Sequence, residues 1–215
     1  VSYSRNTNAG TATVTVTGQG KYTGTPRKTF TIKKAGNAVT AKDITKTTAG
    51  TAQKVSIGAT AKAATTLTYK SSNTLVKVSS KGVVTIPKNF VGSSVITITG
   101  KATTNYNSVN KQITVTVRPR GASLTSLTNP SKLKLKAEWK RNSKVTGYQI
   151  QYAANSSFTS AKTVTVKGNT NVTQTITKSI KKGKTYYVRI RTYKTVDGKN
   201  YYSAWSKALN RKVTK

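Results

Sequence analysis

Alternation of β-branched residues with a period of two is the feature that most constrains this chain. Thr13-Val14-Thr15-Val16-Thr17 and Lys28-Thr29-Phe30-Thr31-Ile32 lie on either side of the Gly-rich run Gly18-Gln19-Gly20, which indicates two antiparallel strands. The sequence contains 40 Thr among 215 residues, and Thr favours strands while tolerating water. The chain is therefore predicted to be all-β, with sheets that each have one wet face, and not disordered.

A repeat links the first strands to later ones. The run 15–18 matches 97–100 at an offset of 82, and the run 30–32 matches 113–115 at an offset of 83. This spacing suits one small β-sandwich, but the first copy lacks most of the sequence that precedes the matching strands in the second. Residues 1–35 are therefore predicted to be the incomplete C-terminal part of a domain. An isolated hairpin is marginal in water, so we expect a neighbour, another chain or preceding sequence to stabilise it.

Tyr22 and Tyr106 occupy equivalent places in the repeat, each shortly before the last strand of its copy. Equivalent placement points to a shared requirement of the fold. We therefore expect both rings to pack at the end of a sandwich rather than to bind a ligand.

Residues 36–119 resemble the bacterial Ig-like domain group 2 (BIG2). The resemblance rests on four runs of sequence, Leu67-Thr68-Tyr69-Lys70-Ser71-Ser72-Asn73, Val76-Lys77-Val78, Gly82-Val83-Val84-Thr85 and Gly92-Ser93-Ser94-Val95-Ile96-Thr97-Ile98. Tyr69 stands where that family usually has Trp, and Lys77 where it usually has Ala. The resemblance implies an Ig-like sandwich and covers about half of this segment.

Residues 120–215 resemble a fibronectin type III domain. Three sets of residues share a strand parity that would line a core: Leu133, Leu135, Ala137 and Trp139; Tyr148, Ile150 and Tyr152; Tyr186, Val188 and Ile190. The run 180–186 lies where that family has its tyrosine corner, with Lys182 in place of the usual Pro. Asp197-Gly198 predicts a tight hairpin turn. We expect Trp139 in the core, and we assign Trp205 to packing.

Together these resemblances imply tandem Ig-like β-sandwiches with a C-terminal fibronectin type III sandwich, joined at 33–36 and 118–121. Such an arrangement is similar to the stalks of secreted and cell-surface proteins of Gram-positive bacteria, which implies an extracellular location. No apolar run approaches the roughly 18 residues of a membrane span, so we expect no insertion into a membrane.

The composition excludes most catalytic chemistry. The chain has no His and no Cys, and Asp43, Glu138 and Asp197 are its only carboxylates. General acid–base catalysis, thiol nucleophiles and metal sites all draw on these residue types. We therefore predict no enzymatic activity, no catalytic residue, no metal site and no cofactor. A Lys–Asn isopeptide cross-link would need a buried carboxylate, and the outward parity of Glu138 argues against one.

Charge is the strongest indication of a partner. Lys and Arg number 38 against 3 acidic residues, giving a net charge of +35, and residues 120–215 hold +19 of it by the same count. Such a field attracts polyanions. Of the basic residues 30 are Lys, which favours diffuse electrostatics over recognition of one phosphate. The expected partner is an anionic envelope polymer or a glycan, with a host glycoprotein as a further partner and nucleic acid bound only nonspecifically.

Two groups in the last domain are candidate ligand-binding residues. Lys132, Lys134 and Lys136 alternate with inward residues and should project from one face. Tyr187, Arg189, Arg191 and Tyr193 should do the same on a later strand, beside Gln149 and Gln151, and such a face can stack on sugar rings and bond to acid groups. The alternatives are that these residues merely cover the sheet, and that the chain is a passive spacer without a ligand.

Overall fold

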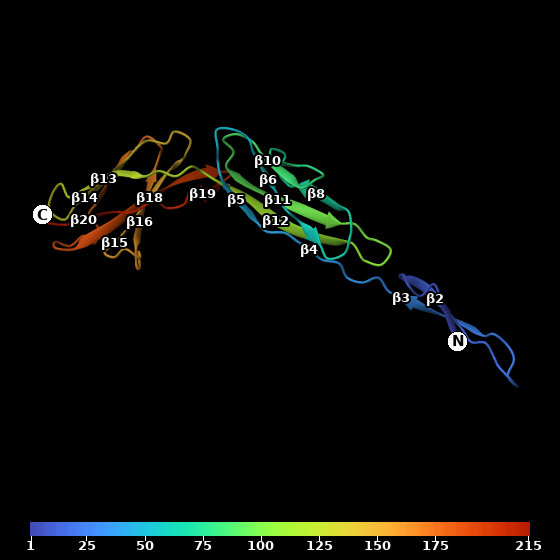
Figure 1. Ribbon diagram of the computed structural model, residues 1–215. Helices are drawn as coiled ribbons and strands as arrows, with labels where there is room; N and C mark the ends of the chain where they lie inside the picture. The colour runs from blue at the N-terminus through green and yellow to red at the C-terminus, as the bar shows by residue number, and fades with distance from the viewer. The chain divides into compact units, whose positions relative to one another are not determined.

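The structure is a computed structural model that describes all of residues 1–215, and it is all-β, as predicted. Twenty strands and no helices are present (Figure 1), so no helix spans a membrane. The chain divides into two compact units, one made of Val1–Ile44, Lys54–Ile86 and Ser94–Val115, the other of Thr45–Gln53, Pro87–Ser93 and Thr116–Lys215. The domain boundaries inferred from the sequence stay a prediction.

The first residues form a three-stranded antiparallel sheet. Its order is β1 (Ser2–Ser4), β2 (Gly10–Thr15) and β3 (Arg27–Ile32), which confirms the predicted pairing of the two alternating runs. Ala12 on β2 is fully buried opposite Phe30. The other apolar residues of the two runs are less well covered: Val14 and Ile32 are half-buried, while Val16 is 44% exposed and Phe30 is 41% exposed.

Polar contacts connect this sheet to the 103–107 loop of the same unit. The Asn105 Oδ1 atom accepts a hydrogen bond from Ala9 N at 2.7 Å, and Asn105 Nδ2 donates to Asn8 Oδ1 at 2.9 Å. Ala35 forms a parallel bridge with Tyr106. The neighbouring loop thus holds the chain in place through hydrogen bonds, but leaves Val16 and Phe30 exposed.

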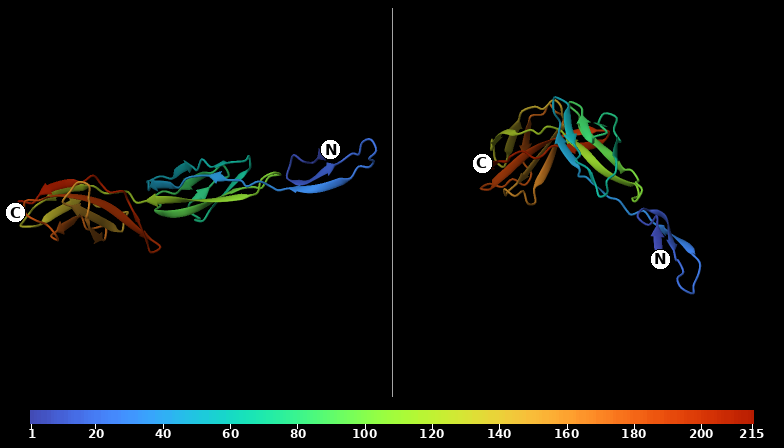
Figure 2. Two further views of the ribbon diagram at one scale, coloured as in Figure 1. Left: turned by 90° about the horizontal axis from the view of Figure 1, so that it is seen from below. Right: turned by 45° about the vertical axis from the view of Figure 1, so that its right-hand side comes forward.

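Residues 39–118 form two larger sheets and a short two-stranded ladder, seen from two further sides in Figure 2. One sheet has the order β5 (Ile44–Thr47), β12 (Val109–Arg118), β11 (Gly92–Gly100) and β8 (Leu67–Ser71). The other has β6 (Gln53–Ser56), β10 (Val83–Ile86) and β9 (Lys77–Val78), while β4 (Val39–Thr40) pairs with β7 (Thr60–Ala61). Alternating residues such as Val84, Ile86, Ile96 and Ile98 are fully buried, as a period-two pattern requires.

The internal repeat has a structural counterpart in these strands. Gly10 opens β2 with a φ of +143° and Gly92 opens β11 with a φ of +152°, at the same offset of 82 that the sequence shows. The side chains differ in burial, because Val16 and Phe30 are exposed whereas their counterparts Ile98 and Ile113 are buried. Tyr22 is 81% exposed, so its expected packing at a sandwich end is wrong; it lies in the open loop between β2 and β3.

Residues 124–212 have the strand order of a fibronectin type III sandwich. One sheet contains β13 (Leu124–Thr128), β14 (Leu135–Trp139) and β17 (Thr173–Ile176). The other contains β16 (Lys162–Lys167), β15 (Gly147–Ala153), β18 (Thr185–Val196) and β19 (Lys199–Tyr202), and β20 (Leu209–Lys212) also pairs with β18.

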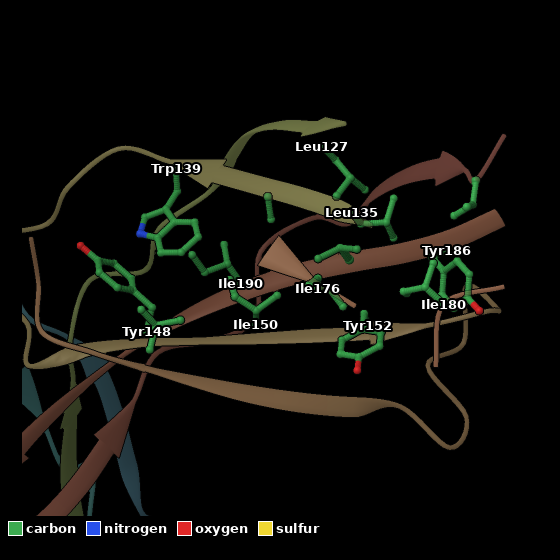
Figure 3. Close-up of a cluster of buried hydrophobic side chains, with 14 of the residues drawn as sticks. Leu127, Leu135, Trp139, Tyr148, Ile150, Tyr152, Ile176, Ile180, Tyr186 and Ile190 are labelled. Carbon is green, nitrogen blue, oxygen red and sulfur yellow. The ribbon is translucent and has the colours of Figure 1, made fainter. Parts of the chain in front are cut away.

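The predicted inward residues of these strands form one hydrophobic core (Figure 3). Tyr148, Ile150 and Ile190 are fully buried, and Trp139 is 3% exposed with its ring 5.1 Å from that of Tyr148. The sequence predicts that Leu133 lines the core with Leu135, Ala137 and Trp139. It lies instead in the turn before β14 with a φ of +51°, and packs against the core only in part.

Two predicted local features are confirmed. The Tyr186 hydroxyl donates to Ser179 O at 2.7 Å and accepts from Lys181 N at 3.0 Å, which is the geometry of a tyrosine corner. Asp197 and Gly198 both have positive φ and join β18 to β19 through a two-residue turn. Such a turn matches the right-handed twist of paired strands.

Candidate functional site

The outer face of the β16–β15–β18 sheet carries the most organised group of polar side chains. Gln149 lies opposite Arg191, and Gln151 lies opposite Arg189, as the sequence analysis expected. All four side chains are half-buried and lie on the face away from the core, since their neighbours Ile150 and Ile190 point inward.

Two hydrogen-bonded rows cross three strands on this face. In the first, Gln149 Nε2 donates to Thr165 Oγ1 at 3.2 Å, and Gln149 Oε1 accepts from Arg191 Nε at 2.9 Å and Nη2 at 2.7 Å. In the second, Gln151 Nε2 donates to Thr163 Oγ1 at 3.5 Å, while Gln151 Oε1 accepts from Arg189 Nε at 2.7 Å. Each glutamine therefore fixes the orientation of one guanidinium group.

Aromatic rings pack next to both guanidinium groups. Arg189 Cζ lies 3.9 Å from the centroid of Phe158 and 5.1 Å from that of Trp205. Arg191 Cζ lies 4.1 Å from Tyr202 and 4.4 Å from Trp205. These distances are within cation–π range. We call the group of Gln149, Gln151, Arg189, Arg191, Phe158, Tyr202 and Trp205 the arginine face.

Two serines place Trp205 between the arginines. Ser203 Oγ accepts the backbone N–H of Thr192 at 3.1 Å, and Ser206 Oγ accepts that of Ile190 at 3.1 Å. The serine hydroxyls occupy positions that carbonyl oxygens of a regular strand would take. The chain therefore bends away from a regular ladder between β19 and β20, and Trp205 lies over β18 instead of in the core.

The two arginines differ in electrostatic environment. Burial lowers the pKa of Arg191 from its ordinary value, the Tyr202 phenol opposes this shift, and the like charge of Arg189 adds to it. Arg191 uses both Nε and Nη2 on Gln149, whereas Arg189 uses only Nε on Gln151. Arg189 therefore keeps both Nη groups for other acceptors.

The other two members of the predicted strand group differ from each other. Tyr187 lies on the same face, opposite Ala153 and Asn210, and is half-buried. Tyr193 shares the strand parity of Arg189 and Arg191, but it is only 6% exposed, so little of its ring is open for stacking on a sugar. Its ring covers Gly147, which has no side chain to displace it, and packs 6.1 Å from the Tyr202 ring.

The three predicted lysines do not form one row. Lys132 lies in the turn before β14, because Asn129 Nδ2 donates to Ser131 O and to Lys134 O and so closes that loop. Lys134 is exposed at the start of β14, and Lys136 lies on the strand.

The charge of Lys136 is already paired. Its Nζ atom lies 2.7 Å from Glu138 Oε1, and Glu138 also accepts a hydrogen bond from Ser126. These contacts hold the pKa of Glu138 below its usual value. β14 belongs to the opposite sheet from β18, so the lysines and the arginine face are separate surfaces of the sandwich.

Sequence reasoning missed the aromatic partners Phe158, Tyr202 and Trp205. Phe158 and Trp205 lie outside regular strands, where residue parity gives no direction. The alternation of Tyr187, Arg189 and Arg191 marks the face, but the rings that cover it come from three other places: Phe158 from the 154–161 loop, Tyr202 from the end of β19 and Trp205 from the 203–208 segment.

No protein-family model matches the chain, and no curated protein matches it. Among solved structures, a cytokine receptor complex is 12% identical, with 83% of this chain and 97% of that chain covered and a TM-score of 0.45. The titin domains A168–A170 are 14% identical, with 96% and 75% covered and a TM-score of 0.32. The FN1–FN3 domains of chicken CNTN1 are 12% identical, with 95% and 77% covered and a TM-score of 0.40.

Proposed function

We propose that the chain is a non-enzymatic, extracellular attachment module of a larger bacterial surface or secreted protein. Its basic terminal segment, residues 120–215, binds an anionic cell-wall polymer or a host glycan. The bacterial assignment rests on the resemblance of residues 36–119 to BIG2 domains and of residues 120–215 to fibronectin type III domains.

The observation that carries this proposal is unpaired positive charge. Residues 120–215 contain 21 basic side chains and only two acidic ones, Glu138 and Asp197. Lys136 forms a salt bridge with Glu138, and most of the other lysines of this segment are exposed. A surface with so few internal counter-charges concentrates polyanions and raises their rate of encounter.

The predominance of lysine indicates what kind of binding to expect. An ammonium group is a hydrated point charge, so several exposed lysines attract a polymer without selecting one chemical group. Such attraction falls with ionic strength, because the Debye length shortens to about 8–10 Å at physiological salt. We therefore expect most of the affinity to be lost at moderate salt.

Retention of the whole chain on immobilised teichoic acid, mucin glycans and duplex DNA tests the proposal. We expect retention on at least one of the first two at about 50 mM salt and a marked decrease at about 200 mM. Equal retention on DNA and on both polymers would indicate nonspecific polyanion binding. No retention on any of them would favour a passive spacer and would refute the proposal.

Matched charge variants show where the polymer binds. Each variant replaces three exposed lysines by glutamine and so changes the net charge equally. The terminal-domain variant changes Lys181, Lys182 and Lys184, and the control changes Lys54, Lys62 and Lys70. The terminal-domain variant should lose more retention, whereas equal losses would show that the charge acts evenly along the chain.

A further inference from the structure

We propose that Arg189 is a specific anion-binding residue within the arginine face. Its two free Nη groups would bind a two-oxygen anion, a carboxylate or a phosphodiester, in a bidentate pair. The inference rests on the proposed function and deepens it, since it names the chemical group that one point of the basic domain would recognise.

Arg189 is held in place before any ligand arrives. Its Nε atom donates to Gln151 Oε1 at 2.7 Å, and its guanidinium group lies 3.9 Å from the Phe158 centroid and 5.1 Å from that of Trp205. An arginine that is already ordered loses little conformational entropy when it binds. A flexible surface lysine has no such advantage.

The remaining donors of Arg189 are open. Neither Nη atom hydrogen-bonds within the chain. Three side-chain nitrogen or oxygen atoms are buried without a partner, namely Asn37 Nδ2, Thr48 Oγ1 and Trp139 Nε1. Neither Nη atom of Arg189 is one of them, so solvent reaches both. The aromatic rings occupy the sides of the guanidinium group and Gln151 takes its Nε position. The edge formed by the two Nη groups therefore remains available to a ligand. Its two parallel N–H donors match the two oxygen atoms of a carboxylate or a phosphate.

The neighbouring residues favour an anion at this edge. Arg191 carries a like charge on the same face, and the repulsion from Arg189 contributes to the lowered pKa of Arg191. An anion at Arg189 would reduce that repulsion. Tyr187 lies two residues along β18 on the same face and is half-exposed, so a sugar ring next to the bound acid group has an aromatic surface within reach.

Arg191 is the internal comparison, because it lies on the same face, also contacts Trp205 and has fewer free donors. Its Nε and Nη2 groups both donate to Gln149, which leaves fewer donors for a ligand than at Arg189. Arg191 therefore stabilises the face, and we assign ligand binding to Arg189.

Exchange of arginine for lysine separates this proposal from diffuse attraction, because the net charge stays at +35. The probes are an oligogalacturonate, which offers carboxylates, and poly(glycerol phosphate), which offers phosphodiesters. Arg189→Lys should weaken binding of the favoured probe about tenfold, as expected for loss of a charge-assisted bidentate pair. Arg211→Lys is the matched control, since Arg211 points to Leu127 O on the other side of β20.

The inference would be overturned if Arg189→Lys bound the probe as tightly as the unchanged protein. In that case the proposed function would still stand, provided that the terminal-domain variant loses retention on the polymer. No binding of either probe by the unchanged protein would overturn the inference, while retention on teichoic acid or mucin glycans would still support the proposed function. A loss with Arg211→Lys as large as with Arg189→Lys would also contradict the inference.

Nitrogen NMR of the arginine side chains gives a second test that needs no variant. Titration of the whole chain with galacturonate, or with glycerol phosphate, should move the Arg189 side-chain resonances more than those of Arg191. Equal shifts of both arginines would refute a specific role for Arg189, even if an exchanged variant failed to fold.

Discussion

Removal of the Tyr186 hydroxyl by Tyr186→Phe should destabilise the terminal sandwich more than the same change at Tyr152. The Tyr186 hydroxyl makes two hydrogen bonds, to Ser179 O and from Lys181 N, whereas the Tyr152 hydroxyl makes one, to Lys178 O at 3.0 Å. Both rings are buried core residues. The two variants therefore differ mainly in how many backbone groups lose a partner.

The magnitude follows from the number of bonds. At about 1 kcal/mol for each hydrogen bond, Tyr186→Phe should cost about 2 kcal/mol and Tyr152→Phe about 1 kcal/mol. For a domain of this size these losses correspond to decreases in Tm of about 8–16 °C and 4–8 °C. Differential scanning calorimetry of the whole chain measures both, and the transition of the terminal sandwich should shift while the rest of the profile stays in place.

An equal or larger loss for Tyr152→Phe would refute this reasoning. It would show that the 179–181 turn finds other partners when the hydroxyl is removed, and that the tyrosine corner contributes little to stability.

Three further results are expected. Gly147→Ala should cost about 1–3 kcal/mol in urea unfolding, because an added Cβ would lie 2.4 Å from Val166 O and 2.8 Å from the Tyr193 ring; a neutral change would contradict the close packing there. Burial raises the pKa of Tyr152 above its ordinary value of 10.0, so stability should fall as pH rises above that value, and Tyr152→Phe should reduce this alkaline loss. The lowered pKa of Glu138 stabilises the fold above about pH 4.5, and this contribution should disappear as pH falls through the lowered pKa; Glu138→Gln should flatten that decrease in acid denaturation.

The core of the terminal sandwich could be predicted from the sequence because one face of each strand is buried against the opposite sheet. Leu135, Ala137 and Trp139 alternate with polar residues, and all three are buried. The predicted alternation failed at Lys132 and Leu133, which lie in the turn that precedes β14. The Asn129 side chain bonds to Ser131 O and Lys134 O, and this local loop overrides the alternation that continues through it in the sequence.

The candidate site was predictable only in part. Period-two spacing placed Arg189 and Arg191 on one face, and the strand order placed Gln149 and Gln151 beside them. Burial of Tyr193 depends on its position opposite Gly147, which requires the register of two strands distant in sequence. Trp205 depends on serine hydroxyls that replace backbone acceptors, and a single sequence does not reveal such replacements.

The scarcity of counter-charges has a consequence for how the molecule responds to its medium. With a net charge of +35 and the pair of Lys136 and Glu138 as its salt bridge, the folded chain repels itself, and mobile ions relieve that repulsion. Salt should therefore raise the melting temperature while it weakens attachment to a polyanion. A bound polyanion supplies the missing negative charge itself, so the chain should be more resistant to heat when attached than when free in a dilute medium.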